Sequence, residues 1–217
     1  MVPRVLDPKM PRDVGALAQR QRIVEAMVDS CAEKTYAATT IADIVSRASI
    51  SRTTFYKRFA DKRECFDAAV DYCIEQIRVV AAAAHTTADP PAQAVPKATA
   101  AILGLMVERP SLARVVAGEA VTVEPAVVDR YRRLMIPAVE AVWDAAGVAR
   151  DGHMDPRLAF GRAQLLVFNE IAAGRPERLA ELLPEIVYLA MAPFAGHEEA
   201  LEQARRATDR PPASAER

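Results

Sequence analysis

The sequence predicts an all-α protein with a small N-terminal helical domain and a larger C-terminal helical bundle. Apolar residues recur at spacings of three and four along most of the chain, which places them on one face of a helix. Prolines and short hydroxyl-rich segments stand where these periodic runs begin and end, as is typical of helix boundaries. With 217 residues, of which 51% are hydrophobic, the chain has room for one small and one larger packed unit.

The N-terminal domain begins with two predicted helices. In residues 22–32, Val24 and Met27 belong to one apolar face, and the helix is expected to end near residues 34–35. A second, short helix follows Thr40, which forms a capping box with Asp43. In such a box the threonine hydroxyl accepts a hydrogen bond from an orphan amide, and the acidic side chain accepts one from the amide of the cap.

A third short helix follows a turn at residues 48–49, with Ser51 as a natural N-cap. Only Phe55 and Phe59 have the spacing of core residues, so the polar and basic side of this helix is free to face outward. Two short helices joined by a tight turn, the second polar and basic, are typical of a helix-turn-helix whose second helix enters the DNA major groove. An ordinary bundle with a solvated basic face is the alternative. A longer helix is predicted for residues 61–84.

The distribution of charge agrees with a DNA-binding N-terminal domain. Residues 1–66 contain 12 Lys and Arg against 8 Asp and Glu, whereas residues 67–217 contain 16 against 21. A mildly basic N-terminal part on an acidic remainder indicates a polyanionic partner for the N-terminal part only.

Residues 40–68 resemble the DNA-binding domain of the TetR family of bacterial regulators. The family signature runs T-x-x-x-I-A, a turn, S-x-x-T-hydrophobic-Y-x-x-F and then K-x-x-L. The matching positions are Thr40, Ile44, Val45, Ser51, Thr54, Phe55, Tyr56, Phe59, Lys62, Cys65 and Phe66. The family usually has glycine where Thr35 and Ser49 stand. A non-glycine residue at positive φ costs on the order of 1 kcal/mol, so we expect a slightly reshaped turn that still functions.

The resemblance implies that double-stranded operator DNA is a partner. Tyr56 and Lys62 match family positions that grip phosphate, and Arg52 at the start of the recognition helix can reach O6 and N7 of guanine. The predicted DNA-binding residues are Thr40, Ser51, Arg52, Thr53, Thr54, Tyr56, Lys57, Arg58 and Lys62.

Beyond residue 84, prolines mark the predicted helix boundaries. The predicted helices cover residues 91–108, 111–118, 124–146, 156–173, 176–193 and 197–207, with a bend at Pro137 and a C-terminal glycine at Gly147. Two of them, 156–173 and 176–193, are apolar on more than one face. Their apolar surface must therefore be buried by more than the core of their own domain.

In the resembled family the last two long helices pair with their twofold copies in a four-helix dimer interface. The residues predicted to lie in or just behind this interface are Phe160, Phe168, Leu183 and Val187. The alternative is a monomer in which both helices are buried in the core.

The function that the resemblance implies is a dimeric repressor, released from a palindromic operator by an unknown small hydrophobic effector. An apolar site with few charges favours such an effector. The predicted ligand-binding residues are the larger side chains of the middle helices, Met106, Tyr131, Met135, Trp143 and Phe168. Each of them is also compatible with an ordinary core position. A ligand-independent regulator, acting as an activator or controlled by a protein partner, is the alternative function.

The residues do not favour an enzyme, a cofactor or a metal site. No nucleophile–base pair, phosphate-binding glycine loop or metal-ligand spacing is present. Three cysteines without C-x-x-C spacing, Cys31, Cys65 and Cys73, are expected to be buried and inert. Three isolated histidines, His85, His153 and His197, receive no catalytic role.

No apolar stretch is long enough to span a bilayer, and no basic-then-apolar leader precedes the first helix, so we expect a cytoplasmic protein without a membrane partner. The expected domains are a disordered basic arm over residues 1–15, the helix-turn-helix domain over 16–66, the ligand-binding and dimerisation domain over 67–207 and a disordered tail over 208–217.

Overall fold

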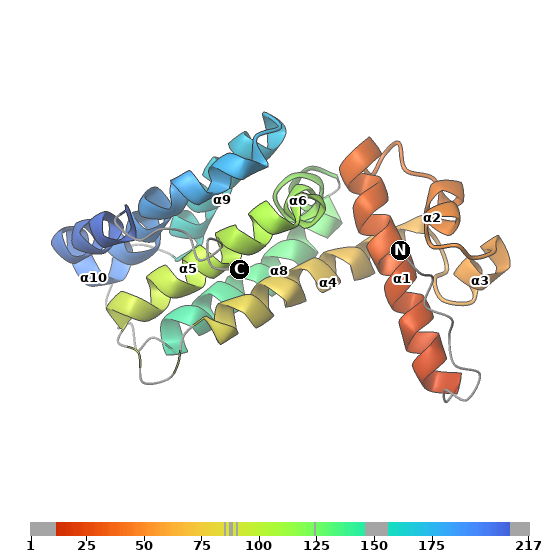
Figure 1. Ribbon diagram of the computed structural model, residues 1–217, viewed down its shortest axis with the longest axis horizontal. Coiled ribbons are helices and arrows are strands. Elements are labelled where there is room, and N and C mark those ends of the chain that lie inside the picture. Colours follow the sequence, from red (N-terminus) through yellow and green to blue (C-terminus); the bar gives the residue numbers. More distant parts are fainter. Residues whose placement is uncertain are drawn as a thin grey trace. The chain divides into compact units, whose positions relative to one another are not determined.

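The computed structural model describes residues 12–84, 86, 89, 91–123, 125–145 and 156–208. These residues form helices and the segments between them, with no strand in the described ranges, which confirms the predicted all-α class (Figure 1). The chain divides into two compact units, Met1–Ala69 and Val70–Arg217, which we call the head and the body. The division lies within one helix, three residues beyond the expected boundary after residue 66.

From residue 12 onward, where the structure describes it, the head contains three helices and the start of a fourth. They are α1 (Arg12–Lys34), α2 (Ile41–Arg47), α3 (Arg52–Tyr56) and α4 (Lys62–Ala83). Helix α2 packs against both α1 and α3. The largest side chains that are fully buried in the head come from all four helices and the segment after α3: Ile23, Val24, Met27, Val28, Ile44, Phe55, Phe59 and Phe66. The core positions predicted for the third helix, Phe55 and Phe59, are confirmed.

Helix α1 starts ten residues earlier than the sequence pattern predicted. Its first residue is Arg12, so residues 12–15, which were assigned to the basic arm, are helical. Apolar periodicity is weak before Ile23, but the segment A-L-A-Q-R-Q over residues 16–21 consists of strong helix formers. Residues 1–11 of the predicted arm lie outside the described residues.

The body continues from α4 through the remaining elements. They are α5 (Pro91–Glu108), α6 (Pro110–Ala113), η1 (Arg114–Glu119), α7 (Ala120–Thr122), α8 (Pro125–Ala145), α9 (Pro156–Ala172), η2 (Pro176–Leu182) and α10 (Leu183–Thr208). Helix α5 packs against α8, η2 and α10, and α9 packs against η1, α8 and α10 (Figure 1). A cluster of buried residues joins α5 to α10: Ala94, Val95, Val187, Met191 and Ala200.

Two predicted body helices differ in detail from the structure. The segment predicted as a helix over 111–118 lies in α6 and the π-helical η1, and the helical path continues beyond it into α7. The start of the helix predicted over 176–193 is instead the 3-10 helix η2. Pro184 stands directly after η2, in the first turn of α10, where the missing amide donor of a proline is tolerated.

Helix α10 is interrupted where the sequence predicted a gap between two helices. Gly196 has φ 81° and ψ 172°, a conformation that breaks the helical path and that glycine adopts without a steric penalty. Helix α8 continues through Pro137 to Ala145. Gly147, where the sequence predicts the end of this helix, lies outside the described residues. The same holds for His85, for His153 and for the tail beyond Thr208.

Candidate nucleic-acid interface

Helix α3 is held rigidly from one side. At its start, the Oγ of Ser51 accepts a hydrogen bond from the amide of Thr54 at 3.1 Å, and the two hydroxyl oxygens are 3.0 Å apart. The ring of Phe55 is completely buried and lies 5.7 Å from the ring of Phe59, measured between centroids. Because a five-residue helix has little stability of its own, these cap and core contacts fix its position.

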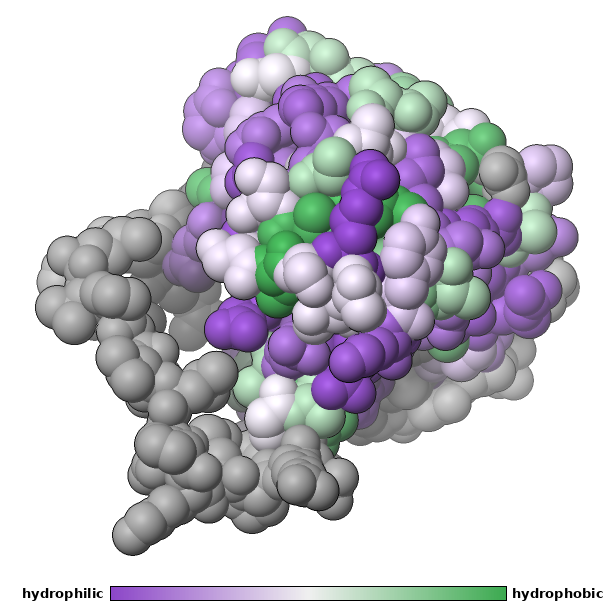
Figure 2. Space-filling view, turned by 90° about the vertical axis from the view of Figure 1, so that its right-hand side faces the viewer, coloured by the Kyte–Doolittle hydropathy of each residue, from purple (hydrophilic) through white to green (hydrophobic). Residues whose placement is uncertain are grey.

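The opposite face of α3 presents four polar side chains to solvent. They are Arg52, Thr53, Tyr56 and the C-cap residue Lys57, all exposed. Tyr56 is 55% exposed although its ring packs edge-on against Phe55. Guanidinium, hydroxyl and ammonium groups are the donors that proteins direct to base edges and phosphates. Figure 2 shows that the side of the molecule that it turns to the viewer is mainly hydrophilic, with a smaller hydrophobic patch.

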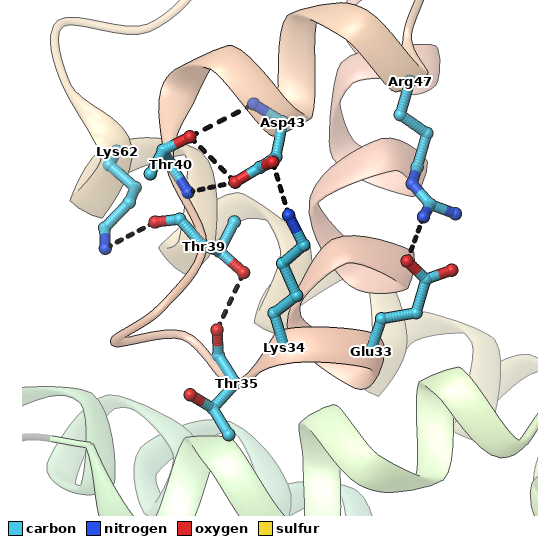
Figure 3. Close-up of polar contacts among 8 residues, drawn as sticks. All are labelled: Glu33, Lys34, Thr35, Thr39, Thr40, Asp43, Arg47 and Lys62. Carbon is cyan, nitrogen blue, oxygen red and sulfur yellow. Dashed lines mark hydrogen bonds and ion pairs between the residues drawn. The ribbon is translucent and has the colours of Figure 1, made fainter.

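Helix α2 is fastened to α1 by ion pairs at both of its ends, of which Figure 3 shows two. Lys34 at the end of α1 pairs with Asp43 in the first turn of α2 at 2.6 Å, and Arg47 in the last turn of α2 pairs with Glu33. The predicted capping box is confirmed, because the Thr40 hydroxyl accepts from the Asp43 amide at 3.2 Å and the Asp43 carboxylate accepts from the Thr40 amide at 2.9 Å. The Lys34 ammonium and the Thr40 donors hold the pKa of Asp43 well below its usual range.

The turn between α2 and α3 keeps the left-handed conformation that glycine would supply. Ser49 has φ 54°. The amide of Ile50 donates to the carbonyl of Val45 at 3.0 Å, and the amide of Ser49 donates to the carbonyl of Ser46 at 3.2 Å, which together form a Schellman motif. Thr35, the other position where the resembled family has glycine, also has a positive φ of 74°. The expected reshaping of the turn is therefore wrong, and the backbone accepts the strain instead.

Five of the nine predicted DNA-binding residues have partners within the head. Thr40 and Ser51 cap α2 and α3, and Thr54 completes the second of these caps. The Nε of Arg58 donates to Gln19 Oε1 on α1 at 3.2 Å, and Lys62 donates to backbone carbonyls of the segment between α1 and α2. Any contact of these five with DNA would come in addition to these bonds. No sequence signal pointed to Gln19, because its partner is 39 residues away.

The sequence of the head matches a known family. Residues 23–69 match the model of the bacterial regulatory proteins of the tetR family. This match identifies the head as a DNA-binding domain of that family. A domain of this kind indicates a DNA-binding regulator of transcription. No curated protein matches the chain.

Solved structures of TetR-like regulators share the fold over most of the chain. The fatty acid degradation regulator FadR from Bacillus halodurans is 15% identical, with a TM-score of 0.67 over 80% of this chain and 94% of that one. FadR from Bacillus subtilis in complex with stearoyl-CoA is also 15% identical, with a TM-score of 0.66 over 81% and 98%. A TetR-like regulator from Rhodococcus sp. RHA1 is 22% identical, with a TM-score of 0.58 over 87% and 100%.

The predicted ligand-binding residues lie on body helices, of which α8 packs on both α5 and α9. Met106 on α5 and Tyr131 and Met135 on α8 are buried, and Phe168 on α9 is half-buried. The side chain of Trp143 lies outside the described residues. The hydroxyl of Tyr131 accepts a hydrogen bond from Gln164 Nε2 on α9 at 3.1 Å, and burial raises the pKa of this phenol. The hydrogen-bonded pair of Tyr131 and Gln164 therefore lies among helices that also bury the apolar side chains of Met106 and Met135.

The predicted dimer residues differ in their exposure. Phe160, Phe168 and Leu183 are half-buried, so their role at an interface stays a prediction. Val187 is completely buried in the cluster that joins α5 to α10, so it could lie only behind such an interface, and this role stays a prediction. Leu165 on α9, which is not among the predicted interface residues, is 58% exposed.

The cysteines lie in the core, and the described residues form no metal site. Cys31, Cys65 and Cys73 are buried free thiols, as predicted, and burial raises the pKa of Cys65 to about 12. Among the described residues, no group of three or more His, Cys, Asp and Glu side chains could hold a metal ion. No helix in the described ranges has the length and apolar character needed to cross a membrane.

Proposed function

We propose that this TetR-family regulator is a repressor that binds a palindromic operator as a homodimer and is released by a hydrophobic effector bound in the body. Residues 16–66 serve as the DNA-binding domain and residues 67–207 as the effector-binding and dimerisation domain. The observation that carries the proposal is the exposed face of α3, where Arg52, Thr53, Tyr56 and Lys57 project from a helix anchored by its cap and by Phe55. With operator DNA as its partner, the protein acts in the cytoplasm.

The side chains of this face suit different parts of a DNA site. Arg52 stands at the first position of α3, from which a guanidinium can bind O6 and N7 of guanine with two hydrogen bonds. Tyr56 and Lys57 stand at its end and suit phosphate oxygens, which position the protein without reading sequence. A twofold dimer would place two such helices in successive major grooves, about 34–36 Å apart.

A long-chain acyl thioester is the effector class that the comparisons support best. Two of the similar structures are named FadR, and one of them is a complex with stearoyl-CoA. In this chain, Met106, Tyr131 and Met135 are buried apolar side chains of α5 and α8, and the pair of Tyr131 with Gln164 adds a hydrogen-bonding group. Such an environment suits an acyl chain with a single polar group near it.

The test has two stages. First, an operator is selected from random duplex DNA with the purified protein, and its affinity is measured by fluorescence anisotropy for the wild type, Arg52→Ala and Tyr56→Phe. Arg52→Ala should weaken binding by about 1–3 kcal/mol and relax the preference at one base position per half-site. Tyr56→Phe should weaken binding to all duplexes about equally. A uniform loss for Arg52→Ala across scrambled operators would contradict its base-reading role.

In the second stage, stearoyl-CoA is titrated into the protein–operator complex below its micelle concentration, with unacylated coenzyme A as the matched control. We expect stearoyl-CoA to raise the operator dissociation constant and the thermal midpoint of the free protein, and coenzyme A to change neither. If no acyl chain changes either quantity while operator binding is intact, the ligand-independent regulator becomes the better account.

A further inference from the structure

The segment over residues 35–39, which connects α1 to α2, is held in a strained conformation. Thr35 has φ 74°, and for a β-branched residue this left-handed conformation is a genuine outlier. Such strain persists only where surrounding contacts determine the backbone fully. Within the segment, the hydroxyl of Thr39 donates to the carbonyl of Thr35 at 2.7 Å, and Thr39 is only 2% exposed. We call residues 35–39 the α1–α2 loop.

Lys62, at the start of α4, is the side chain that fixes this loop from outside it. Its ammonium donates to the carbonyl oxygens of Tyr36 and Thr39, both at 2.9 Å. The same nitrogen lies 4.3 Å from the centre of the Tyr36 ring, and that ring lies 4.5 Å from the ring of Phe66 on α4. Figure 3 shows Lys62 reaching toward Thr39, whose hydroxyl in turn reaches Thr35.

These contacts determine what Lys62 can do. An ammonium group has three N–H donors, and two of them here are directed to loop carbonyls while a ring faces the charge. A phosphate contact would need the charge to face outward. Lys62 is half-buried, and its ammonium is instead directed to the loop that its hydrogen bonds stabilise.

The loop ends directly at the cap of α2. Thr39 precedes Thr40, whose capping box with Asp43 begins that helix. Since α2 packs against α3, a shift of the α1–α2 loop would be transmitted through α2 to the recognition face of α3. We propose that Lys62 is a positioning residue for DNA recognition, which sets the place of α2 and α3 through the loop and makes no phosphate contact. This inference rests on the proposed role of α3 in binding DNA.

The salt dependence of operator binding separates the two roles. Each phosphate contact contributes about 0.9 to the slope of log K against log salt concentration. For Lys62→Met, which removes the charge and keeps the length, we expect operator affinity to fall roughly 10-fold, as for the loss of a charge-assisted hydrogen bond, with an unchanged slope. Amide hydrogen exchange in residues 35–47 should become faster. Lys57→Met is the matched control, since this exposed lysine is expected to lower the slope without changing that exchange.

A second-site change tests the link to the strained loop. Glycine adopts the left-handed conformation without a Cβ clash, so Thr35→Gly should restore part of the operator affinity in the Lys62→Met background and change the wild-type affinity less. If Lys62→Met does not fold, Tyr36→Leu takes its place. It keeps the charge of Lys62 but removes the ring beside the ammonium, and should lower affinity and speed loop exchange at an unchanged slope.

The outcomes are distinct. A slope lowered by about 0.9 in Lys62→Met, with unchanged exchange in the loop, would show a phosphate contact and overturn the inference. Unchanged affinity and exchange would overturn it as well. A wild-type protein that selects no duplex would refute the proposed DNA-binding function itself, whereas the first two outcomes leave that function standing.

Discussion

At the scale of single residues, two parts of this protein build the same backbone turn with different side chains. After α9, Gly174 has φ 71°, with its amide bonded to the carbonyl of Ile171 at 3.0 Å and the amide of Arg175 bonded to Glu170 at 2.9 Å. After α2, Ser49 forms the same pair of hydrogen bonds at φ 54°. The turn in the head therefore carries a steric cost that the turn in the body avoids.

Exchanging the two residue types should move stability in opposite directions. Ser49→Gly should raise the free energy of unfolding of the head by about 0.5–1 kcal/mol, since relief of the left-handed strain exceeds the added entropy of glycine in the unfolded chain. Gly174→Ser should lower the stability of the body by a similar amount, because a Cβ there meets nothing within 4 Å and only the backbone conformation opposes it. Urea denaturation of each variant measures both effects. A destabilised Ser49→Gly protein would contradict this account.

Local residue patterns predicted some of these features and could not predict others. The caps at Thr40 and Ser51 depend on residues three positions apart, so the sequence was sufficient to find them. The partners of Lys62 lie 23 and 26 residues away, and the resemblance to the family suggested a different role for that side chain. Contacts of this range depend on how the helices pack, which a linear pattern does not contain.

At the scale of helices, α2 depends on charged groups at both of its ends. Lys34 binds Asp43 in its first turn, and Glu33 binds Arg47 in its last turn. The negative charge of the carboxylate in the first turn also interacts favourably with the helix dipole. A short helix fixed in this way keeps its place on α1 with few apolar contacts of its own.

The depressed pKa of Asp43 predicts an acid-sensitive head. A carboxylate whose pKa is lower in the folded state contributes stability that is fully present above the unfolded value of about 3.9 and is lost as the pH falls toward the folded value. Asp43→Asn should therefore reduce the stability of the head at pH 7, and the difference from the wild type should shrink below about pH 4. Denaturation monitored at a series of pH values measures it. A difference independent of pH would show that the Lys34 ion pair adds nothing.

Helix boundaries were predictable where a proline or a cap marks them. Pro91, Pro156 and Pro176 each begin an element at the position that the sequence predicted. The early start of α1 was not visible, because residues 12–21 show helix propensity without apolar periodicity. The π-helical geometry of η1 and the 3-10 geometry of η2 were also missed, since spacing patterns distinguish helix from strand more readily than one kind of helix from another.

At the scale of the whole molecule, the protein consists of two compact units joined through one continuous helix. Helix α4 runs from Lys62 to Ala83 and crosses the division after Ala69. Just beyond this point, Asp71 accepts two hydrogen bonds from Arg130 on α8, at 3.0 and 2.5 Å. The next residue, Tyr72, accepts one from Arg109 at 3.2 Å. The part of α4 that belongs to the body is thus tied to the segments that hold the proposed effector residues.

These ties predict how the effector and the operator influence each other. In the wild type, stearoyl-CoA and operator DNA should bind with a negative coupling of about 1–3 kcal/mol. Asp71→Asn weakens the bond to Arg130, so the coupling should decrease although each partner still binds alone. Operator titrations with and without saturating stearoyl-CoA measure the coupling, and Glu75→Gln, in an exposed ion pair with Arg78 on α4 itself, is the matched control. Equal coupling in all three proteins would exclude Asp71 as part of the connection.

Exposure within one chain predicts which apolar residues support a dimer. Leu165→Glu places a charge at a side chain that is 58% exposed and should dissociate the homodimer while leaving each chain folded. Val187→Glu buries a charge in the cluster between α5 and α10 and should unfold the body instead. Sedimentation together with circular dichroism distinguishes the two results. A Leu165→Glu protein that remains dimeric would exclude this part of α9 from the interface.

The three buried thiols can be used to measure how often the protein opens locally. Cys31 and Cys65 belong to the head and Cys73 to the body, and the folded state shields all three from reagents in solution. Since a thiol reacts as its thiolate, the raised pKa of Cys65 adds a chemical barrier to the steric one. The speed at which each sulfur is alkylated at neutral pH therefore reports how often its own unit opens. One reagent in one sample can then follow the head and the body separately as DNA or an acyl chain is added.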